Sequence, residues 1–214
     1  MDVTARFVEV VRGPVATMPL DEALFLVAAH DHDVDIDDGR RRLDDLAAGC
    51  GDGRLDGLRR VLFDGDAPFV GDADDYHHPD NSFLDRVLER RRGLPILLSV
   101  VYVEVARRAG VALAGVGLPG HFVVGHFGVT PPVLLDPFAG GAPVAAEHPA
   151  GIVRPWHAHE IALRMLNNLV GSYRRRGDIV SAIRAASMRL DLPTGPVIHD
   201  AMRQELLAMQ AQLN

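Results

Sequence analysis

Hydrophobic and polar positions divide the chain into three regions. Apolar residues recur every three to four positions in residues 1–92, which is typical of amphipathic helices. The clearest stretches are "PLDEALFLVAAH", "DDGRRRLDDLA" and "NSFLDRVLERRRG". In the third stretch, Ser82 followed by Asp85 predicts a helix start, and Gly93 predicts its end. We therefore expect an N-terminal helical region.

The second region, 93–150, combines one long apolar segment with several short ones. "PILLSVVYVEVARRAG" is rich in valine but exceeds the length of a buried strand. Pro95 at its start, two arginines near its end and Gly110 after them favour a helix, and its apolar faces predict burial. The runs "VALAGVG", "HFVVGHF" and "PVLLDPF" then predict an antiparallel meander.

The third region, 151–214, is helical again. "HEIALRMLNNLVGSYRRRGDIVSAIRAASMRLDLP" contains two helical patterns that meet at Gly177 and Asp178 and end before Pro193. A last helix is expected from about Val197 to Leu213. The helix pair has the length of one tetratricopeptide unit, and one such unit cannot bury its apolar face alone. We predict an α+β fold: a buried central helix against a small antiparallel sheet, flanked by N-terminal and C-terminal helices.

Composition removes several function classes. The chain has 214 residues, of which 48% are hydrophobic, enough for one core. Its 22 basic and 29 acidic side chains give a net charge of −7, which argues against a nucleic-acid partner. All basic residues are arginines, so a Schiff-base or P-loop lysine is excluded. Cys50 is the single cysteine, which excludes an internal disulfide and a multi-cysteine zinc site.

The sequence predicts a cytoplasmic localisation. No apolar stretch approaches the roughly 18 uninterrupted residues that a membrane span needs. The N-terminus lacks the basic and apolar segments of a secretion signal. We therefore expect no membrane partner.

Two polar residues stand where short strands are expected to begin or end. His121 follows a glycine turn in "GLPGHFVV", and Asp136 closes an apolar run in "LLDPF". A histidine and an aspartate on neighbouring strands are two members of a nucleophilic triad. We predict that they pair at about 2.6–3.2 Å. A structural alternative is that the pair only orients two strands.

A long continuous stretch resembles a known family. "YHHPDNSFLDRVLERRRGLPILLSVVYVEVARRAGVALAGVGLPGHFVV", with "LLDPFAGG" after it, resembles the transglutaminase-like core of the bacterial SirB family. "ALRMLNNLVGSYRRRGD" resembles the tetratricopeptide segment that follows the core there. The resemblance covers residues 20–214 and implies a papain-like fold, with the central helix start facing the histidine and aspartate. In active members of the wider superfamily, a cysteine at that helix start performs acyl transfer or peptide-bond hydrolysis.

The expected cysteine is missing from this chain. A helix N-terminus lowers a thiol pKa, so a reactive cysteine belongs in the first turn. That turn is 95–98, and the superfamily's pattern places the nucleophile near Pro95 or Ile96, neither of which can attack a carbonyl. SirB-type proteins often carry a polar residue at the place of Leu97. Ser99 is the remaining candidate, although a serine inside a helix usually bonds the carbonyl four residues back.

Two functional hypotheses follow. The first is a transglutaminase-like protein without its nucleophile, a pseudoenzyme that binds a protein or peptide partner or serves as a regulatory module. The second is a hydrolase or acyltransferase that uses Ser99, or a water activated by His121 and Asp136. Cys50 lies outside the matching motif and is interpreted as a structural residue.

Other polar clusters are interpreted as structural, and we expect no metal and no cofactor. "DHDVDIDDG" has the spacing of a calcium loop, but Asp38 and Asp44 replace the glycine and glutamate that such a loop requires. The histidines of "WHAHE" and "YHHPD" lack the spacing of ligands on one helix face. Asn81 and Ser82 are interpreted first as capping residues and second as substrate contacts.

Overall fold

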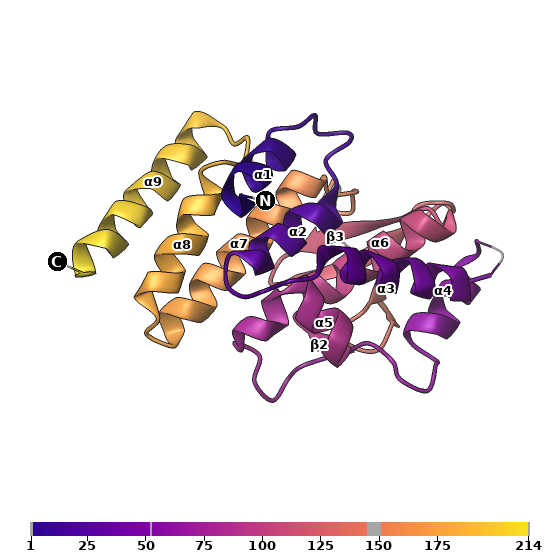
Figure 1. The fold of residues 1–214 in the computed structure, drawn as a ribbon. Helices are drawn as coiled ribbons and strands as arrows, with labels where there is room; N and C mark the ends of the chain where they lie inside the picture. Colours follow the sequence, from indigo (N-terminus) through magenta and orange to yellow (C-terminus); the bar gives the residue numbers. More distant parts are fainter. Residues whose placement is uncertain (1, 52, 145–150, 214) are drawn as a thin grey trace.

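A computed structural model describes residues 2–51, 53–144 and 151–213 (Figure 1). Its N-terminal part is helical, as predicted. The helices are α1 (Val3–Val11), α2 (Leu20–Ala29), α3 (Ile36–Gly49), α4 (Leu55–Leu62), the 3-10 turn η1 (Pro79–Ser82) and α5 (Leu84–Arg90). Apolar faces of the five α-helices in this list share one core with the central helix α6 (Pro95–Ala109).

The central helix has the boundaries that the sequence predicts. Pro95 occupies the first helical position, where its missing N–H costs no hydrogen bond. Gly110 ends the helix with φ of 74°, a left-handed conformation that glycine adopts without strain. The whole first turn is buried, and the exposed fractions of Ile96 and Leu97 are 1% and 0%.

A four-stranded antiparallel meander packs on α6. Its strands are β3 (Leu113–Leu118), β4 (His121–His126), β5 (Val133–Asp136) and β6 (Ala142–Val144), in the order β3-β4-β5-β6. The three predicted strands are confirmed, and the sheet has the edge strand β6 in addition. A separate parallel pair joins β1 (Val70–Gly71) to β2 (Arg92–Gly93). Each of these strands has two residues, too short to show a periodic pattern.

The boundaries predicted for α5 are wrong at both ends. Ser82 belongs to η1, and α5 begins at Leu84 after Phe83, which makes no side-chain capping bond. The helix ends at Arg91, whose φ of 53° is left-handed, whereas Gly93 pairs with β1. Arg91 is fixed in this conformation by tertiary contacts: its Nη1 donates to the Ala67 carbonyl at 2.6 Å, and its guanidinium lies 5.0 Å from the Phe69 ring.

The C-terminal part forms a row of helices, α7 (Ala158–Arg175), α8 (Ile179–Arg189) and α9 (Pro196–Gln210). Figure 1 shows α7 against the core and α9 farthest from it. The predicted pair of helices is present, and Asp178 caps α8 by accepting from the Ser181 N–H at 3.0 Å. The last helix ends at Gln210, and a 3-10 turn occupies 211–213.

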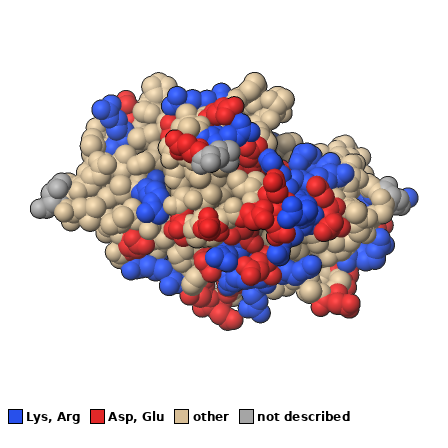
Figure 2. Space-filling model, in the orientation of Figure 1, with Lys and Arg blue, Asp and Glu red and all other residues tan. Residues whose placement is uncertain are grey.

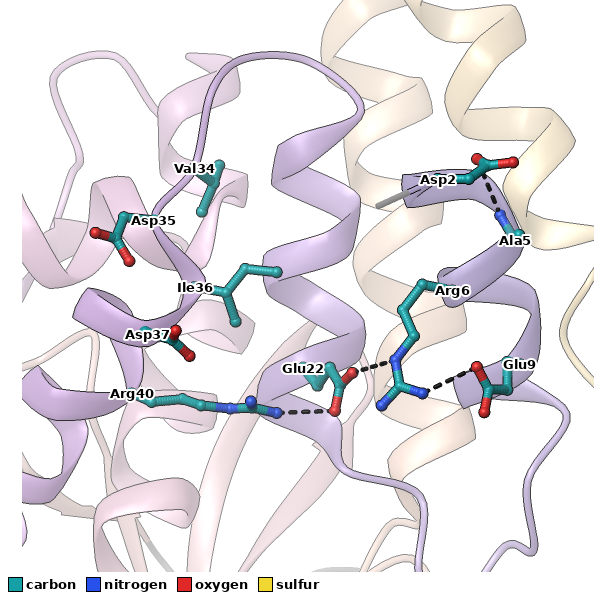
Figure 3. Close-up of a pocket in the computed structure, with 10 residues that line it drawn as sticks. All are labelled: Asp2, Ala5, Arg6, Glu9, Glu22, Val34, Asp35, Ile36, Asp37 and Arg40. Atoms are coloured by element: carbon teal, nitrogen blue, oxygen red, sulfur yellow. Dashed lines mark hydrogen bonds and ion pairs between the residues drawn. The ribbon is translucent and has the colours of Figure 1, made fainter.

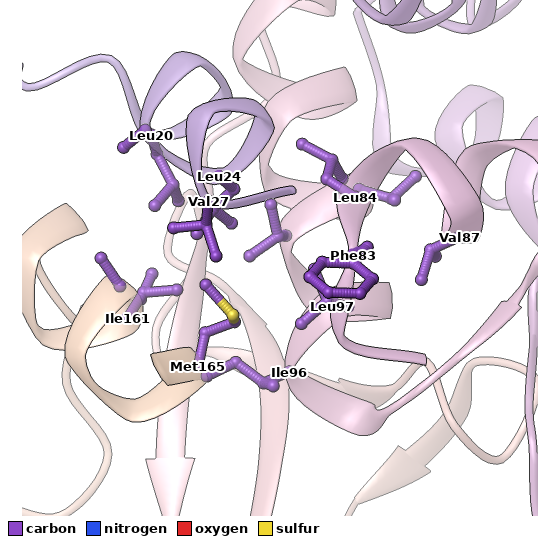
Figure 4. Packing of buried hydrophobic residues seen from close by; sticks show 14 of the residues in the cluster. Leu20, Leu24, Val27, Phe83, Leu84, Val87, Ile96, Leu97, Ile161 and Met165 are labelled. Carbon is purple, nitrogen blue, oxygen red and sulfur yellow. The ribbon is translucent and has the colours of Figure 1, made fainter. Parts of the chain in front are cut away.

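One core cluster contains side chains from all three sequence regions. Figure 4 shows its members from α2, α5, α6 and α7 around the start of α6. Met165 of α7 and Phe83 are fully buried with Ile96 and Leu97 in this cluster. The start of the central helix is therefore part of the hydrophobic core.

Candidate functional site

The sheet brings His121 and Asp136 together, as predicted. His121 is the first residue of β4 and follows Gly120, whose φ of 71° makes the tight turn from β3 possible. Asp136 is the last residue of the neighbouring strand β5. The two side chains pair at 2.8 Å between His121 Nε2 and Asp136 Oδ2. This distance lies within the range expected from the sequence.

The carboxylate of Asp136 is held on both oxygens. Oδ1 accepts a hydrogen bond from the backbone N–H of Phe138 at 2.9 Å, while Oδ2 faces His121. A carboxylate can only accept, so neutral His121 carries its proton on Nε2 and leaves Nδ1 as an acceptor. The exposed fractions of the two side chains are 33% for His121 and 16% for Asp136, so the imidazole is accessible to a ligand.

Ser99 is not brought into hydrogen-bond contact with this pair. Its side chain is completely buried, and its hydroxyl has no hydrogen-bond partner among the described residues. The expected bond to the carbonyl four residues back is also absent there, so that expectation was wrong. The first turn of α6 carries no ionisable side chain.

Cys50 lies at the end of α3, on elements that do not carry the His121–Asp136 pair. Its thiol is buried and contacts the Leu46 carbonyl oxygen at 3.4 Å. Burial raises the pKa of the Cys50 thiol, and nearby Arg60 only partly opposes this effect. Both the burial and the raised pKa oppose formation of a reactive thiolate.

We expect Cys50→Ser to leave ligand binding and any activity unchanged. The serine hydroxyl can keep the contact with Leu46, so we expect a loss of about 1 kcal/mol or less in unfolding free energy. Thiol labelling of the native protein should be slow and should accelerate on unfolding. Loss of binding by a variant that still folds would contradict this prediction.

A loop at residues 72–82 lies before α5 and carries Asn81, which was interpreted as a capping residue. That interpretation was wrong: Asn81 is fully buried and its Nδ2 donates to the Asp75 carbonyl at 2.8 Å. Arg90 bonds both the Asn81 Oδ1 at 3.0 Å and the Asp72 Oδ2 at 2.9 Å. Asn81 therefore fixes the shape of the 72–82 loop, because its amide and carbonyl are both engaged.

Two residues near the pair were not singled out from the sequence. Arg164 of α7 donates from Nη2 to the His121 carbonyl at 3.0 Å. Tyr76, on the 72–82 loop, has its ring 5.9 Å from the ring of Phe138, which is two residues after Asp136. Arg164 interrupts the apolar run "IALRML", a signal visible in the sequence, but only the packing of α7 places it beside His121.

The other polar clusters have structural roles. Asp31 accepts from the Tyr173 hydroxyl at 2.6 Å, and Asp35 caps α3 by accepting from the Asp38 N–H at 2.9 Å. His159 of the "WHAHE" stretch bonds the Val11 carbonyl oxygen at 2.7 Å. No group of three or more His, Cys, Asp or Glu side chains suited to a metal ion occurs in the part of the chain that the structure describes.

A cavity of about 930 Å³ lies apart from the pair, among α1, α2 and α3 (Figure 3). The charged groups that line it are largely paired with one another. Glu22 accepts from Arg6 Nε at 2.6 Å and from Arg40 Nη2 at 2.8 Å, and Arg6 also bonds Glu9 at 2.9 Å. These ion pairs link the three helices, which is a structural role.

Surface charge shows no single-sign region on the face seen in Figure 2, where acidic and basic side chains lie next to one another. Among the described residues, no helix is both long and apolar enough to cross a membrane.

A central helix buried against an antiparallel meander, with a histidine–aspartate pair at the ends of adjacent strands, defines a transglutaminase-like protein. The chain matches the Transglutaminase-like superfamily over residues 29–168 and belongs to this family.

Curated relatives of the chain come from bacteria and animals. A "UPF0162 protein" of Xylella fastidiosa strain 9a5c is 37% identical over 179 residues, which cover 72% of this chain and 60% of the relative. F-box only protein 21 of Mus musculus is 42% identical over 59 residues, which cover 28% of this chain and 9% of the relative. The human F-box only protein 21 is 41% identical over 59 residues. The chain thus spans about 60% of the length of the Xylella relative. No solved structure gave a significant match.

Proposed function

We propose that this chain is a SirB-type transglutaminase-like protein without a cysteine nucleophile, which binds a protein or peptide segment over the His121–Asp136 pair. In this proposal the C-terminal helices are a tetratricopeptide-like segment packed on the core, and the protein serves as a binding or regulatory module. The observation that carries it is that Pro95, Ile96 and Leu97 are buried in the first turn of α6, where the family resemblance places the reactive residue near Pro95 or Ile96.

Three physical reasons support the loss of catalysis. Proline lacks the backbone N–H that a helix start offers to a thiolate or an oxyanion. The side chains of Ile96 and Leu97 belong to the core and leave no polar group at the helix start. Finally, Ser99 is completely buried and makes no bond to His121, so a base does not activate it.

The same geometry supports binding. Asp136 holds the imidazole of His121 in one orientation through the bond at 2.8 Å. His121 Nδ1 has no hydrogen-bond partner among the described residues and can accept from a backbone N–H of a peptide. A fixed, partly exposed acceptor on a strand suits an extended segment laid along the site.

One observation favours the second candidate, a hydrolase or acyltransferase. His121 is oriented by a carboxylate and keeps one ring nitrogen free, which is the arrangement of a general base. Such an enzyme would use an activated water, or Ser99 after a rearrangement that exposes its hydroxyl.

A fluorophosphonate probe, which phosphonylates an activated serine and releases fluoride, and a selection from a displayed peptide library separate the two candidates. We expect no covalent labelling of the wild-type protein and no ester or amide turnover. We expect His121→Ala to weaken selected peptides about fivefold or more, the effect of one ligand hydrogen bond. His126→Ala, at the other end of β4, is the matched control and should bind normally.

Two results would support the enzyme instead of the binding protein. Labelling traced to Ser99, together with loss of hydrolysis in a folded Ser99→Ala variant, would establish the enzyme and overturn the binding proposal. Turnover that survives Ser99→Ala but disappears in His121→Ala would establish the activated-water mechanism.

A further inference from the structure

Arg164 lies beside the His121–Asp136 pair and has no acidic partner among the residues that the structure describes. The chain has 29 acidic and 22 basic side chains, and many of its arginines pair with carboxylates. Within the described residues, the single hydrogen bond of the Arg164 guanidinium runs from Nη2 to the His121 carbonyl at 3.0 Å. Its Nε and Nη1 have no bond there and are not among the buried unpaired atoms, so each keeps some exposure to solvent.

Aromatic rings hold this guanidinium in place. Its central carbon lies 5.4 Å from the centre of the Phe122 ring and 5.6 Å from that of Trp156. Trp156 itself packs closely on β3, because a Cβ at Gly117 would lie only 2.0 Å from its ring. Cation–π contacts thus fix the position of the guanidinium, and its N–H groups that make no bond to the protein can donate to a ligand.

The surface beside Arg164 is suited to an anion. Arg164 and Arg175 are eleven residues apart on α7, three helical turns, and therefore lie on one face of that helix. Arg176 ties the neighbouring 72–82 loop to α7 through Asp75, with Nη2–Oδ distances of 2.5 and 2.7 Å. This tie holds the loop that carries Tyr76 against α7, and the Tyr76 ring packs on Phe138. Burial raises the pKa of Tyr76, and the positive charges of Arg164 and Arg175 partly oppose that rise.

We propose that Arg164 and Tyr76, beside His121, form a subsite for a carboxylate of the bound peptide. This inference rests on the proposed peptide-binding function and adds what the site recognises. The planar guanidinium fork matches the two oxygens of a carboxylate, and the Tyr76 hydroxyl supplies a further donor. A doubly charged phosphate fits less well, because its second negative charge would be repelled by the Asp136 carboxylate that pairs with His121.

The direct test uses small carboxylates as probes on the full chain. N-acetylglycine represents a peptide C-terminus, and N-acetylglutamate α-amide represents an acidic side chain. N-acetylglycinamide and inorganic phosphate serve as the neutral and the doubly charged comparisons. Arginine Nε–Hε resonances are followed by NMR during each titration. We expect a carboxylate probe to shift the Arg164 resonance, and the stronger of the two identifies the source of the carboxylate.

Variants assign the effect to the proposed residues. Arg164→Gln should weaken carboxylate binding at least about tenfold, as expected for loss of a charge-assisted pair. Arg164→Lys keeps the charge without the fork and should retain part of the affinity. Arg174→Gln is the matched control on the same helix, because Arg174 instead contacts Glu205 at 3.3 Å. Thermal unfolding of each variant checks that the fold is kept.

Other outcomes would contradict the carboxylate subsite or the peptide-binding function separately. If displayed peptides bind equally well to wild type and Arg164→Gln, and no carboxylate shifts Arg164, the carboxylate subsite is wrong while peptide binding stands. If carboxylates bind at Arg164 but no library peptide is selected, the subsite stands and the peptide-binding function fails. Phosphate binding as tight as carboxylate binding would overturn the carboxylate assignment in favour of a general anion site.

Discussion

Arg108→Met is expected to destabilise the folded protein by about 3–5 kcal/mol, the range for removing one member of a buried ion network. Arg108 lies in the last turn of α6, and 12% of its side chain is exposed. It bonds Asp21 at 2.6 Å, Asp44 at 2.7 Å and Glu104 at 2.5 Å. Burial alone would lower the pKa of Arg108, but these three carboxylates raise it above the ordinary value.

The cost comes from the carboxylates that stay behind. The side chains of Asp21 and Glu104 are 5% and 3% exposed, so without Arg108 two buried negative charges lose their shared partner. Methionine has a similar length and keeps most of the packing, which isolates the effect of charge. Equilibrium urea unfolding measures the difference between variant and wild type.

Arg107→Met is the control for this prediction. Arg107 also bonds Glu104, at 2.9 Å, but its side chain is 59% exposed, so its removal should cost less than about 1 kcal/mol. Equal effects of the two substitutions would show that the buried network does not stabilise α6 against α2 and α3.

Deletion of residues 156–214 is expected to prevent stable folding of the remaining chain. Helix α7 contributes a stripe of fully buried apolar side chains to the same core as α6. These side chains are Ile161, Met165, Leu166, Leu169 and Val170, each with at most 3% exposure. At roughly 1.5–3 kcal/mol for each buried side chain, their loss costs about 10 kcal/mol. This is comparable to the whole stability of a typical domain, roughly 5–15 kcal/mol.

Size-exclusion chromatography and thermal unfolding of the fragment 1–155 measure this effect. We expect aggregation or absence of a cooperative transition, because the α7-facing side of the core becomes exposed. Deletion of 196–214 alone is the control. It removes α9, whose buried residues are Met202, Leu206 and Met209, and should leave a folded protein of lower stability. A monomeric 1–155 with an unchanged melting temperature would show that the C-terminal helices are an independent module.

Local sequence was sufficient where a structural element has its own start and stop signals. Pro95 and Gly110 fixed both ends of the central helix, since a proline suits a first helical position and a glycine suits a left-handed end. Turn residues between short apolar runs likewise predicted the meander. The pairing of His121 with Asp136 followed, because adjacent antiparallel strands bring such ends together.

Local signals were misleading where a distant contact is stronger. Ser82 and Gly93 looked like the limits of α5, but Ser82 belongs to η1 and Gly93 belongs to β2, which pairs with β1. A left-handed Arg91 ends the helix instead, stabilised by Ala67 and Phe69, which are distant in sequence. Two-residue strands and a strained arginine have no periodic pattern, so sequence periodicity could not reveal them.

The sequence by itself determined the α+β class, the central helix, the meander and the absence of an ionisable group at residues 95–98, because each depends on neighbours in the chain. Only the tertiary structure decided what surrounds His121. It buried Ser99 without a bond to the imidazole. It also placed Arg164 at the His121 carbonyl and Tyr76 against Phe138, from segments far apart in sequence. The physical reason is that packing of α7 and of the 72–82 loop sets these distances, and packing depends on contacts across the whole chain.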